Sequence, residues 1–169
     1  MKIVITGTTC AGKSTTLDLL AKRGFEVVPE SALEIINEQN AIGGDILPTK
    51  NVKKFQEAIL DRQLEKESEL TDEKNYFLDR SIVDQFGYCN FFKIDCPQKV
   101  FDLAKERYDK VFLLEPLDFI DNRFEHESRE DQLNIDIEIR KAYEHFGYEY
   151  ILVPLDKPEK RVEFVLNNI

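Results

Sequence analysis

The amino-acid sequence predicts an α/β fold in which an open, mostly parallel β-sheet is covered by helices on both faces. Two observations support this prediction. Short β-branched segments alternate along the chain with longer segments whose apolar residues recur at helical spacing, a pattern typical of parallel βαβ units. In addition, the glycine-rich segment GTTCAGKST at 7–15 lies between the first expected strand and the first expected helix, where phosphate-binding loops occur in such folds.

The bulk composition favours one soluble domain. The 169 residues are enough for a substantial core, so we expect residues 1–169 to form a single domain. The formal net charge of −10 argues against binding nucleic acid through a broad basic surface, since such binding depends on neutralising phosphates. The three cysteines have neither disulfide nor zinc spacing, and no apolar run has the length of a signal peptide core or a membrane span. We expect a cytoplasmic monomer or homodimer without nucleic-acid or membrane partners.

Three strands and three helices are expected in the first half of the chain. Gly24 provides a C-terminal stop for the first helix, and Pro29 ends the second strand. Ser31, followed three residues later by Glu34, predicts a capping box at the start of the second helix. The third helix carries one apolar stripe on a charged background. The expected strands are 2–6, 25–30 and 76–81, and the expected helices are 13–23, 31–40 and 50–70.

The second half of the chain continues the alternation, with one ambiguous segment. LNIDIEIR at 133–140 alternates between apolar and polar residues, which by period alone predicts a strand. The same residues also form a broad helical face that extends to Phe146, and the charged neighbouring segment supplies no hairpin partner. We therefore expect a helix at 133–146 that ends at Gly147. The other expected elements are helices at 83–92 and 97–107, strands at 110–116 and 148–154, and a short helix from Pro158.

The segment 7–15 has the spacing of a phosphate-binding loop, with Gly7, four further residues and then Gly12-Lys13-Ser14. The glycines allow a tight turn whose N–H groups point into one concavity, and the following helix adds its unpaired N-terminal N–H groups. Lys13 is expected to place its ammonium group against the β and γ phosphates of ATP, and the Ser14 hydroxyl is expected to be a ligand for Mg²⁺. The expected nucleotide-binding residues are Gly7, Thr8, Thr9, Cys10, Ala11, Gly12, Lys13, Ser14 and Thr15.

Three charged residues stand at the carboxyl ends of expected strands, where parallel sheets bind their ligands. Asp79 follows a strand expected beside the first, so its carboxylate is placed to hold Mg²⁺ opposite Ser14, while Arg80 is placed to pair with a phosphate or the substrate. Glu30, at the end of the second strand, is suited to take a proton from an attacking hydroxyl or to orient the acceptor. The alternatives are a structural ion pair for Asp79 and Arg80, and a capping or solvated carboxylate for Glu30.

The charged segment 117–132 follows the fourth expected strand and contains Arg123 and Arg129. Phosphoryl transfer spreads negative charge over the γ-phosphate oxygens, and arginines on a closing lid stabilise that charge. We therefore expect a lid at about 117–132, with both arginines as catalytic residues. The alternative is a solvated charged helix with i,i+4 pairs such as Glu125 with Arg129.

Six stretches that cover most of the chain carry a family resemblance: VITGTTCAGKSTTLDLLAKRGFEVVPESALEII, FQEAILDRQLEKE, FLDRSIVDQFGYC, RYDKVFLLEP, SRED and YEHFGYEYILVP. Together they resemble the small P-loop predicted ATPases related to the nicotinamide ribonucleoside kinase domain, within the wider class of nucleoside and nucleotide kinases. The resemblance implies a five-stranded parallel core with a short lid, and it supports the helix at 133–146. It leaves the phosphate acceptor open, since many members of this group have none assigned.

The leading hypothesis is an ATP- and Mg²⁺-dependent phosphotransferase that acts on a small hydroxyl-bearing acceptor, with a nucleoside or nucleotide as the first candidate. The alternative is a nucleotide-binding ATPase or regulatory switch without a small-molecule acceptor. The chain is too short for the helical subdomain of AAA-type motors, and it lacks the N/T-K-x-D guanine-recognition motif of Ras-like GTPases. A kinase must enclose an acceptor beside Glu30 and Asp79, whereas a switch needs only the nucleotide.

Overall fold

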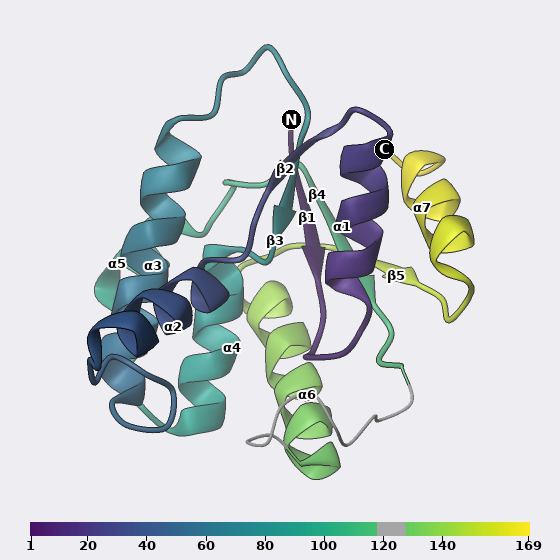
Figure 1. Ribbon diagram of the computed structural model, residues 1–169. Coiled ribbons are helices and arrows are strands. Elements are labelled where there is room, and N and C mark those ends of the chain that lie inside the picture. The colour runs from purple at the N-terminus through teal and green to yellow at the C-terminus, as the bar shows by residue number, and fades with distance from the viewer. Residues whose placement is uncertain (118–127) are drawn as a thin grey trace.

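Five parallel strands form one sheet in the order β2-β3-β1-β4-β5 in the computed structural model, which describes residues 1–117 and 128–169 (Figure 1). The central strand β1 pairs in parallel with β3 on one side and with β4 on the other. The strands are β1 Lys2–Thr6, β2 Glu26–Val28, β3 Tyr76–Asp79, β4 Lys110–Leu114 and β5 Ile151–Val153. The predicted α/β fold is confirmed, and the sheet is parallel throughout.

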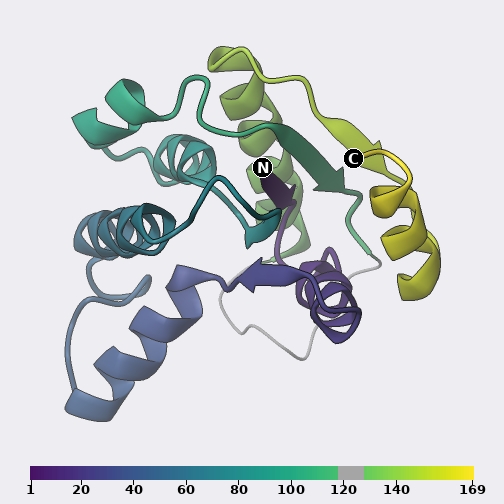
Figure 2. The same ribbon diagram turned by 90° about the horizontal axis from the view of Figure 1, so that it is seen from above.

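Helices cover both faces of this sheet, because successive strand side chains point to opposite faces. Ile3 and Ile5 of β1 belong to one buried cluster, together with residues of α1 (Lys13–Lys22) and α7 (Pro158–Leu166). Val4, between them, belongs to the cluster of the opposite face. The helices on that side are α3 Val52–Ser68, α4 Ile82–Phe92, α5 Gln98–Leu103 and α6 Arg129–His145. Seen from above, the two sets of helices lie on either side of the strands (Figure 2).

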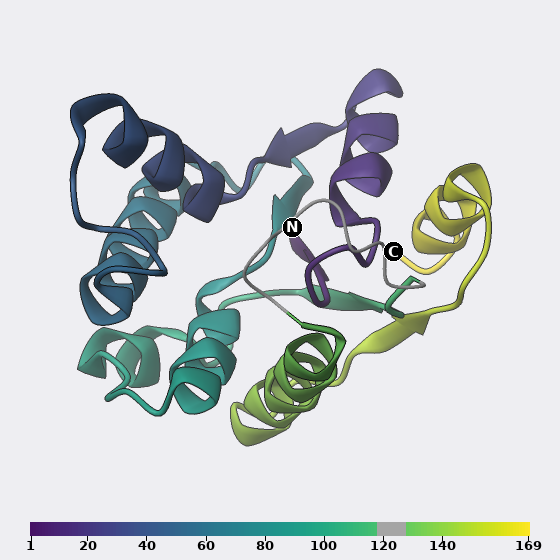
Figure 3. The same cartoon turned by 60° about the horizontal axis from the view of Figure 1, so that its bottom comes forward.

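Helix α2 (Ser31–Ile42) and the first half of α3 form a separate arm beside the sheet. Ile35 of α2 packs there against Phe55 and Ile59 of α3 in a third, smaller buried cluster. This helix pair stands away from α1 and α7 at the edge where the strands end (Figure 3). The arm therefore adds a wall beyond the carboxyl ends of the strands.

The structure corrects several predicted boundaries. The predicted capping box at Ser31 is wrong, because α2 begins at Ser31 itself and Glu30 is the N-cap residue without a side-chain cap. Ser31 is buried inside the first turn, and Glu34 instead forms ion pairs with Arg62 and Lys66. Helix α5 is shorter than the predicted helix at 97–107, since it ends at Leu103.

The ambiguous segment at 133–140 lies within helix α6, so the helical interpretation is confirmed. The helix begins earlier than predicted, at Arg129, because Ser128 and Asp131 form a capping box at its start. One side of α6 contributes Ile135, Ile139 and Tyr143 to the core beneath the sheet.

Among residues 1–117 and 128–169, no helix is both long and apolar enough to span a membrane.

Candidate active site

The segment 7–15 forms a tight loop between β1 and α1, and two positions in it require glycine. Gly7 has φ +137°, and a Cβ atom there would lie 2.8 Å from the carbonyl oxygen of Leu114. Gly12 has φ +83° and is the left-handed N-cap residue of α1. Side chains are strained in that region of φ. The glycine spacing noted in the sequence therefore has a conformational cause, and the N-terminus of α1 opens toward the loop.

Lys13 is the first residue of α1, and its side chain turns back into the loop. Its Nζ atom is buried and donates a hydrogen bond of 2.7 Å to the carbonyl oxygen of Thr8. Burial, together with the nearby positive charge of Arg80, lowers the pKa of Lys13 to about 8. Added negative charge, such as that of a phosphate group, would stabilise this buried ammonium group.

Glu30 and Arg80, predicted from two different strand ends, form a close ion pair. Arg80 Nε donates to Glu30 Oε1 at 2.8 Å, and Arg80 Nη1 donates to the carbonyl oxygen of Gly7 at 3.0 Å. The Arg80 guanidinium group also lies 5.1 Å from the centre of the Tyr88 ring. Burial opposes ionisation of Glu30, but the charges of Arg80 and Lys13 outweigh it and lower the pKa of this carboxyl group. Arg80 thus connects the phosphate loop to the end of β2.

Asp79, the last residue of β3, is the carboxylate of the site that is best suited to bind a metal ion. It is only 6% exposed, and its Oδ1 atom has no hydrogen-bond partner among the described residues. Burial raises its pKa to about 6, although Lys13 acts in the opposite direction. Ser14 is exposed at the start of α1. In the described part of the chain no cluster of three or more His, Cys, Asp or Glu side chains could hold a metal ion.

This donor set fits Mg²⁺ rather than a metal that needs a protein cage. Mg²⁺ in phosphate sites is held by one or two protein oxygens, with waters and substrate phosphates completing its coordination. The unpartnered oxygen of Asp79 and the exposed side chain of Ser14 match that requirement. The metal and nucleotide roles of these residues stay predictions.

A buried polar cluster behind the loop was not predicted from the sequence. Asp84 Oδ1 accepts a hydrogen bond from the Thr6 hydroxyl, and Asp84 Oδ2 accepts one from the Tyr143 hydroxyl at 2.6 Å. Asp84 also accepts from the backbone N–H and hydroxyl of Ser81, which caps α4. The Ser-x-x-Asp spacing at Ser81 and Asp84 is a local signal that could have revealed this cap.

The predicted strand ends enclose one cavity of about 780 Å³. At one end, Thr9, Cys10 and Gly12–Thr15 line it, while Glu30, Asp79 and Arg80 stand at its middle. Its inner end lies between α2, α3 and α4. The polar side chains there are Gln56, Gln63 and Gln85, and the aromatic ones are Phe55, Tyr88, Phe91 and Phe92. The three glutamines were not predicted from the sequence, because their placement depends on how α3 and α4 pack.

Of the two predicted lid arginines, only Arg129 belongs to the described residues. Arg123 lies in 118–127, outside the described residues. Arg129 is exposed at the start of α6 and does not line the cavity, whereas Asp131, two residues further on, does. Gly7, Thr8 and Ala11 shape the phosphate loop from behind, since they are buried and do not line the cavity.

Two glycines with positive φ shape the loop between a buried strand and a helix, and a buried lysine begins that helix. Together these features define a P-loop domain. A family model described as an AAA domain matches residues 2–161, so the chain belongs to this AAA-domain family. Among curated proteins, none matches the chain by sequence.

Solved structures of nucleoside and nucleotide kinases share the fold. Deoxyadenosine kinase from M. mycoides, with the products dCMP and a flexible dCDP bound, has a TM-score of 0.68 and 21% identity over 99% of this chain and 97% of that chain. Thymidylate kinase from Ehrlichia chaffeensis has a TM-score of 0.66 and 16% identity over 99% and 97%. The NadR protein in complex with NR has a TM-score of 0.70 and 16% identity, and the match covers 98% of this chain but 49% of that chain.

Proposed function

We propose that this protein is an ATP- and Mg²⁺-dependent phosphotransferase whose acceptor is a nucleoside or nucleotide. The observation that carries the proposal is the extension of the cavity beyond the phosphate loop. A nucleotide switch needs a site for its phosphates and base, whereas this cavity continues past Glu30 and Arg80 to side chains of α2, α3 and α4. Its volume of about 780 Å³ lies in the range of small-molecule sites.

The character of the inner end supports a flat, polar-edged acceptor. Phe91 and Phe92 supply aromatic surface, and the buried amide oxygens of Gln56 and Gln85 lack hydrogen-bond partners among the described residues. Buried polar atoms of this kind are normally satisfied by a partner. Nucleobases offer both a face for aromatic contact and edge groups for hydrogen bonds. The acceptors named for the similar kinase structures are of this chemical class, which supports the same proposal here.

The residues at the middle of the cavity have complementary roles in this proposal. Lys13 would bind the β and γ phosphates of ATP, and Ser14 and Asp79 would hold Mg²⁺, which would neutralise charge on these phosphates. Arg80 is positioned by Glu30 and the Gly7 carbonyl, so its guanidinium group faces both the phosphate and acceptor ends. Glu30, kept ionised by Arg80, orients the acceptor hydroxyl and accepts its proton. Phosphoryl transfer asks mainly for such positioning and charge stabilisation.

We also propose a domain organisation, an oligomeric state and a role for the two lid arginines. Residues 1–169 act as one kinase-like domain, as a monomer or homodimer, and Arg123 and Arg129 meet the charge of the transferring phosphoryl group. A lid at 117–132 is mostly outside the described residues.

The test is a panel of nucleosides and nucleotides assayed for ADP release and for the phosphorylated product. A kinase should release ADP slowly alone and much faster with one class of acceptor. Glu30→Gln should remove the acceptor-dependent rate and retain ATP binding. ADP release that no acceptor accelerates would instead favour the nucleotide-binding ATPase or switch.

A further inference from the structure

Gln63 lies on the α3 wall at the inner end of the cavity, and its amide is held from behind by Glu67. Gln63 Nε2 donates a hydrogen bond of 3.0 Å to Glu67 Oε1. Both side chains are buried, with 4% of Gln63 and 2% of Glu67 exposed. On its other side, Gln63 Oε1 accepts a long hydrogen bond of 3.4 Å from the Ser31 hydroxyl, which also lines the cavity.

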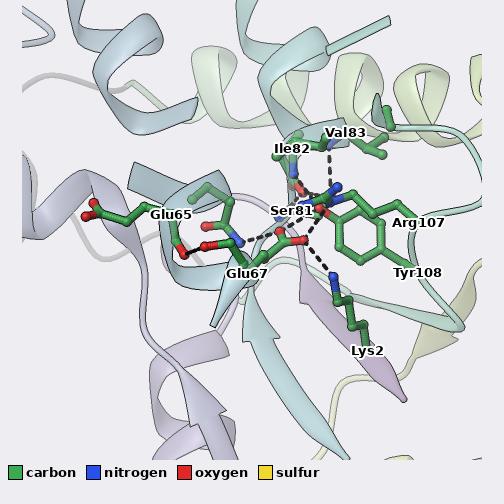
Figure 4. A network of polar contacts seen from close by, with 12 residues as sticks. Lys2, Glu65, Glu67, Ser81, Ile82, Val83, Arg107 and Tyr108 are labelled. Atoms are coloured by element: carbon green, nitrogen blue, oxygen red, sulfur yellow. Dashed lines mark hydrogen bonds and ion pairs between the residues drawn. The ribbon is translucent and has the colours of Figure 1, made fainter. Parts of the chain in front are cut away.

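Glu67 is surrounded by hydrogen-bond donors and positive charges (Figure 4). Arg107 Nε donates to its Oε2 at 2.6 Å, and Lys2 Nζ lies 3.6 Å from the same atom. The Tyr108 hydroxyl donates to Oε1 at 2.8 Å and accepts from the backbone N–H of Ile82 at 3.0 Å. Arg107 and Lys2 thus place two positive charges beside this buried carboxylate, and a paired charge is far less costly to bury than an isolated one.

Arg107 and Tyr108 both donate to Glu67, so its oxygens act as acceptors, and this fixes the orientation of the Gln63 amide. Its NH₂ group must face Glu67, so its carbonyl oxygen must face Ser31 and the cavity. The amides of Gln56 and Gln85 also reach the cavity, but their buried oxygens have no partner among the described residues. Only for Gln63 do the contacts decide which end of the amide meets a ligand.

We propose that Glu67 makes Gln63 an obligate hydrogen-bond acceptor, and that the cavity therefore selects acceptor molecules whose base carries an exocyclic NH₂ group. This inference rests on the proposed kinase function, because it concerns the acceptor end of the same cavity. Gln63 is the specificity-determining residue and Glu67 is its positioning residue. A base without the NH₂ group leaves the Gln63 oxygen buried and poorly paired.

The substitution Glu67→Gln should invert this arrangement. Arg107 can only donate, so the oxygen of the new amide must face Arg107 and its NH₂ group must face Gln63. Gln63 then turns over to accept that hydrogen bond and presents its own NH₂ group to the cavity. The NH₂ group of Gln63 then faces the exocyclic NH₂ group of the base, and neither can accept a hydrogen bond from the other. The preference of the protein for an amino-bearing base is therefore lost.

The experiment compares adenosine with purine riboside and cytidine with pyrimidin-2-one riboside, since each pair differs only by one exocyclic amino group. We measure kcat/KM for phosphorylation with ATP and, separately, nucleoside affinity without ATP. In at least one pair, the wild-type protein should favour the amino-bearing member about tenfold, as for an unpaired buried acceptor. Glu67→Gln and Gln63→Met should both lower kcat/KM and affinity for the amino-bearing member and leave those for the other member almost unchanged.

If Glu67 had a purely structural role, Glu67→Gln would lower kcat/KM equally for both members of a pair. The ratio of the two kcat/KM values therefore separates a positioning role from a general loss of structure. Glu65→Gln is the matched control, because Glu65 is an exposed residue of the same helix that pairs only weakly with Arg62, at 3.7 Å. It should retain the tenfold ratio. If Glu67→Gln does not fold, Gln63→Met decides the question alone.

Equal kcat/KM for both members of each pair in the wild-type protein, or a preference that survives Gln63→Met, overturns the inference while the kinase function stands. A preferred acceptor without any NH₂ group in the wider ADP-release panel does the same. ADP release that no acceptor in that panel accelerates overturns the kinase function, and the inference with it.

Discussion

The guanidinium group of Arg161 in α7 donates a hydrogen bond of 2.7 Å to the carbonyl oxygen of Ala11, 150 residues earlier in the phosphate loop. Its second Nη atom donates at 3.0 Å to the carbonyl oxygen of Glu115, just after β4. Arg161 is only 3% exposed. One buried side chain therefore ties the loop to the C-terminal helix and to the neighbouring strand.

Arg161→Met should loosen the phosphate loop. The substitution keeps much of the apolar stem but leaves the carbonyl oxygens of Ala11 and Glu115 without this donor. Hydrogen bonds to charged groups contribute about 1.5–3 kcal/mol, so we expect ATP affinity to fall about tenfold in calorimetry. Arg23→Met is the control, because Arg23 joins α1 to α7 through an exposed ion pair of 2.7 Å with Glu163. An equal loss of affinity in both variants would mean that α7 packing, rather than the contact to the loop, is responsible.

Lys13→Ala should abolish stabilisation by ATP. A ligand at one hundred times its dissociation constant stabilises a protein by about 2.7 kcal/mol, which for a domain of this size corresponds to roughly 5–10 °C in melting temperature. The wild-type protein should show this shift with ATP and Mg²⁺ in a thermal melt. Lys22→Ala, at the exposed end of the same helix, should retain it. An undiminished shift in Lys13→Ala would remove the loop from the nucleotide site.

Tyr143→Phe tests the buried cluster behind the loop. Tyr143 donates to Asp84 at 2.6 Å and lies 2.8 Å from the Ser81 hydroxyl, so the substitution removes a donor from a buried carboxylate. We expect a loss of about 1–3 kcal/mol in the free energy of unfolding, measured by urea denaturation. Tyr76→Phe is the control, because its hydroxyl contacts Thr71 at an exposed edge. Equal stability of the two variants would contradict a structural role for the Asp84 cluster.

Much of the fold and the position of the phosphate loop within it could be predicted, because those signals are local. The glycine spacing of the loop is visible within eight positions, and parallel strands bring Glu30 and Asp79 to one edge by topology alone. Glu67 and Gln63 were not predicted, since α3 looks like a charged surface helix until its contacts with α2, β1 and residues 107–108 are known. Arg161 lies 150 residues from its partner, and no sequence pattern connects the two.

Arg129→Ala tests the predicted catalytic role of Arg129, a residue that does not line the cavity. If Arg129 meets charge that develops during transfer, its loss should lower kcat at least about tenfold and leave ATP affinity nearly unchanged. Arg129→Lys should rescue poorly, because a single ammonium group cannot reproduce the guanidinium fork. Arg140→Ala, in the same helix and paired with Asp136 at 2.6 Å, is the control. Unchanged kcat in Arg129→Ala would make this residue part of a solvated helix start.

Asp79→Asn should separate stability from activity. Burial raises the pKa of Asp79 to about 6, above its ordinary value of 3.8. The folded protein therefore binds the proton of the Asp79 carboxyl group more tightly than the unfolded chain does. The contribution of this protonation to the free energy of unfolding is fully present below about pH 4 and is lost as the pH rises through about 6.

At pH 7.5, without nucleotide, the ionised and buried Asp79 carboxylate should therefore destabilise the wild-type protein relative to Asp79→Asn by on the order of 3 kcal/mol. The difference should shrink as the pH is lowered toward 4, in urea denaturation curves recorded across this range. Turnover with ATP, Mg²⁺ and an acceptor should be lost in the variant, because an amide is a poor Mg²⁺ ligand and carries no charge. A residue that serves only as a structural ion pair predicts the reverse: Asp79→Asn would then be less stable than wild type at pH 7.5 and would still turn over.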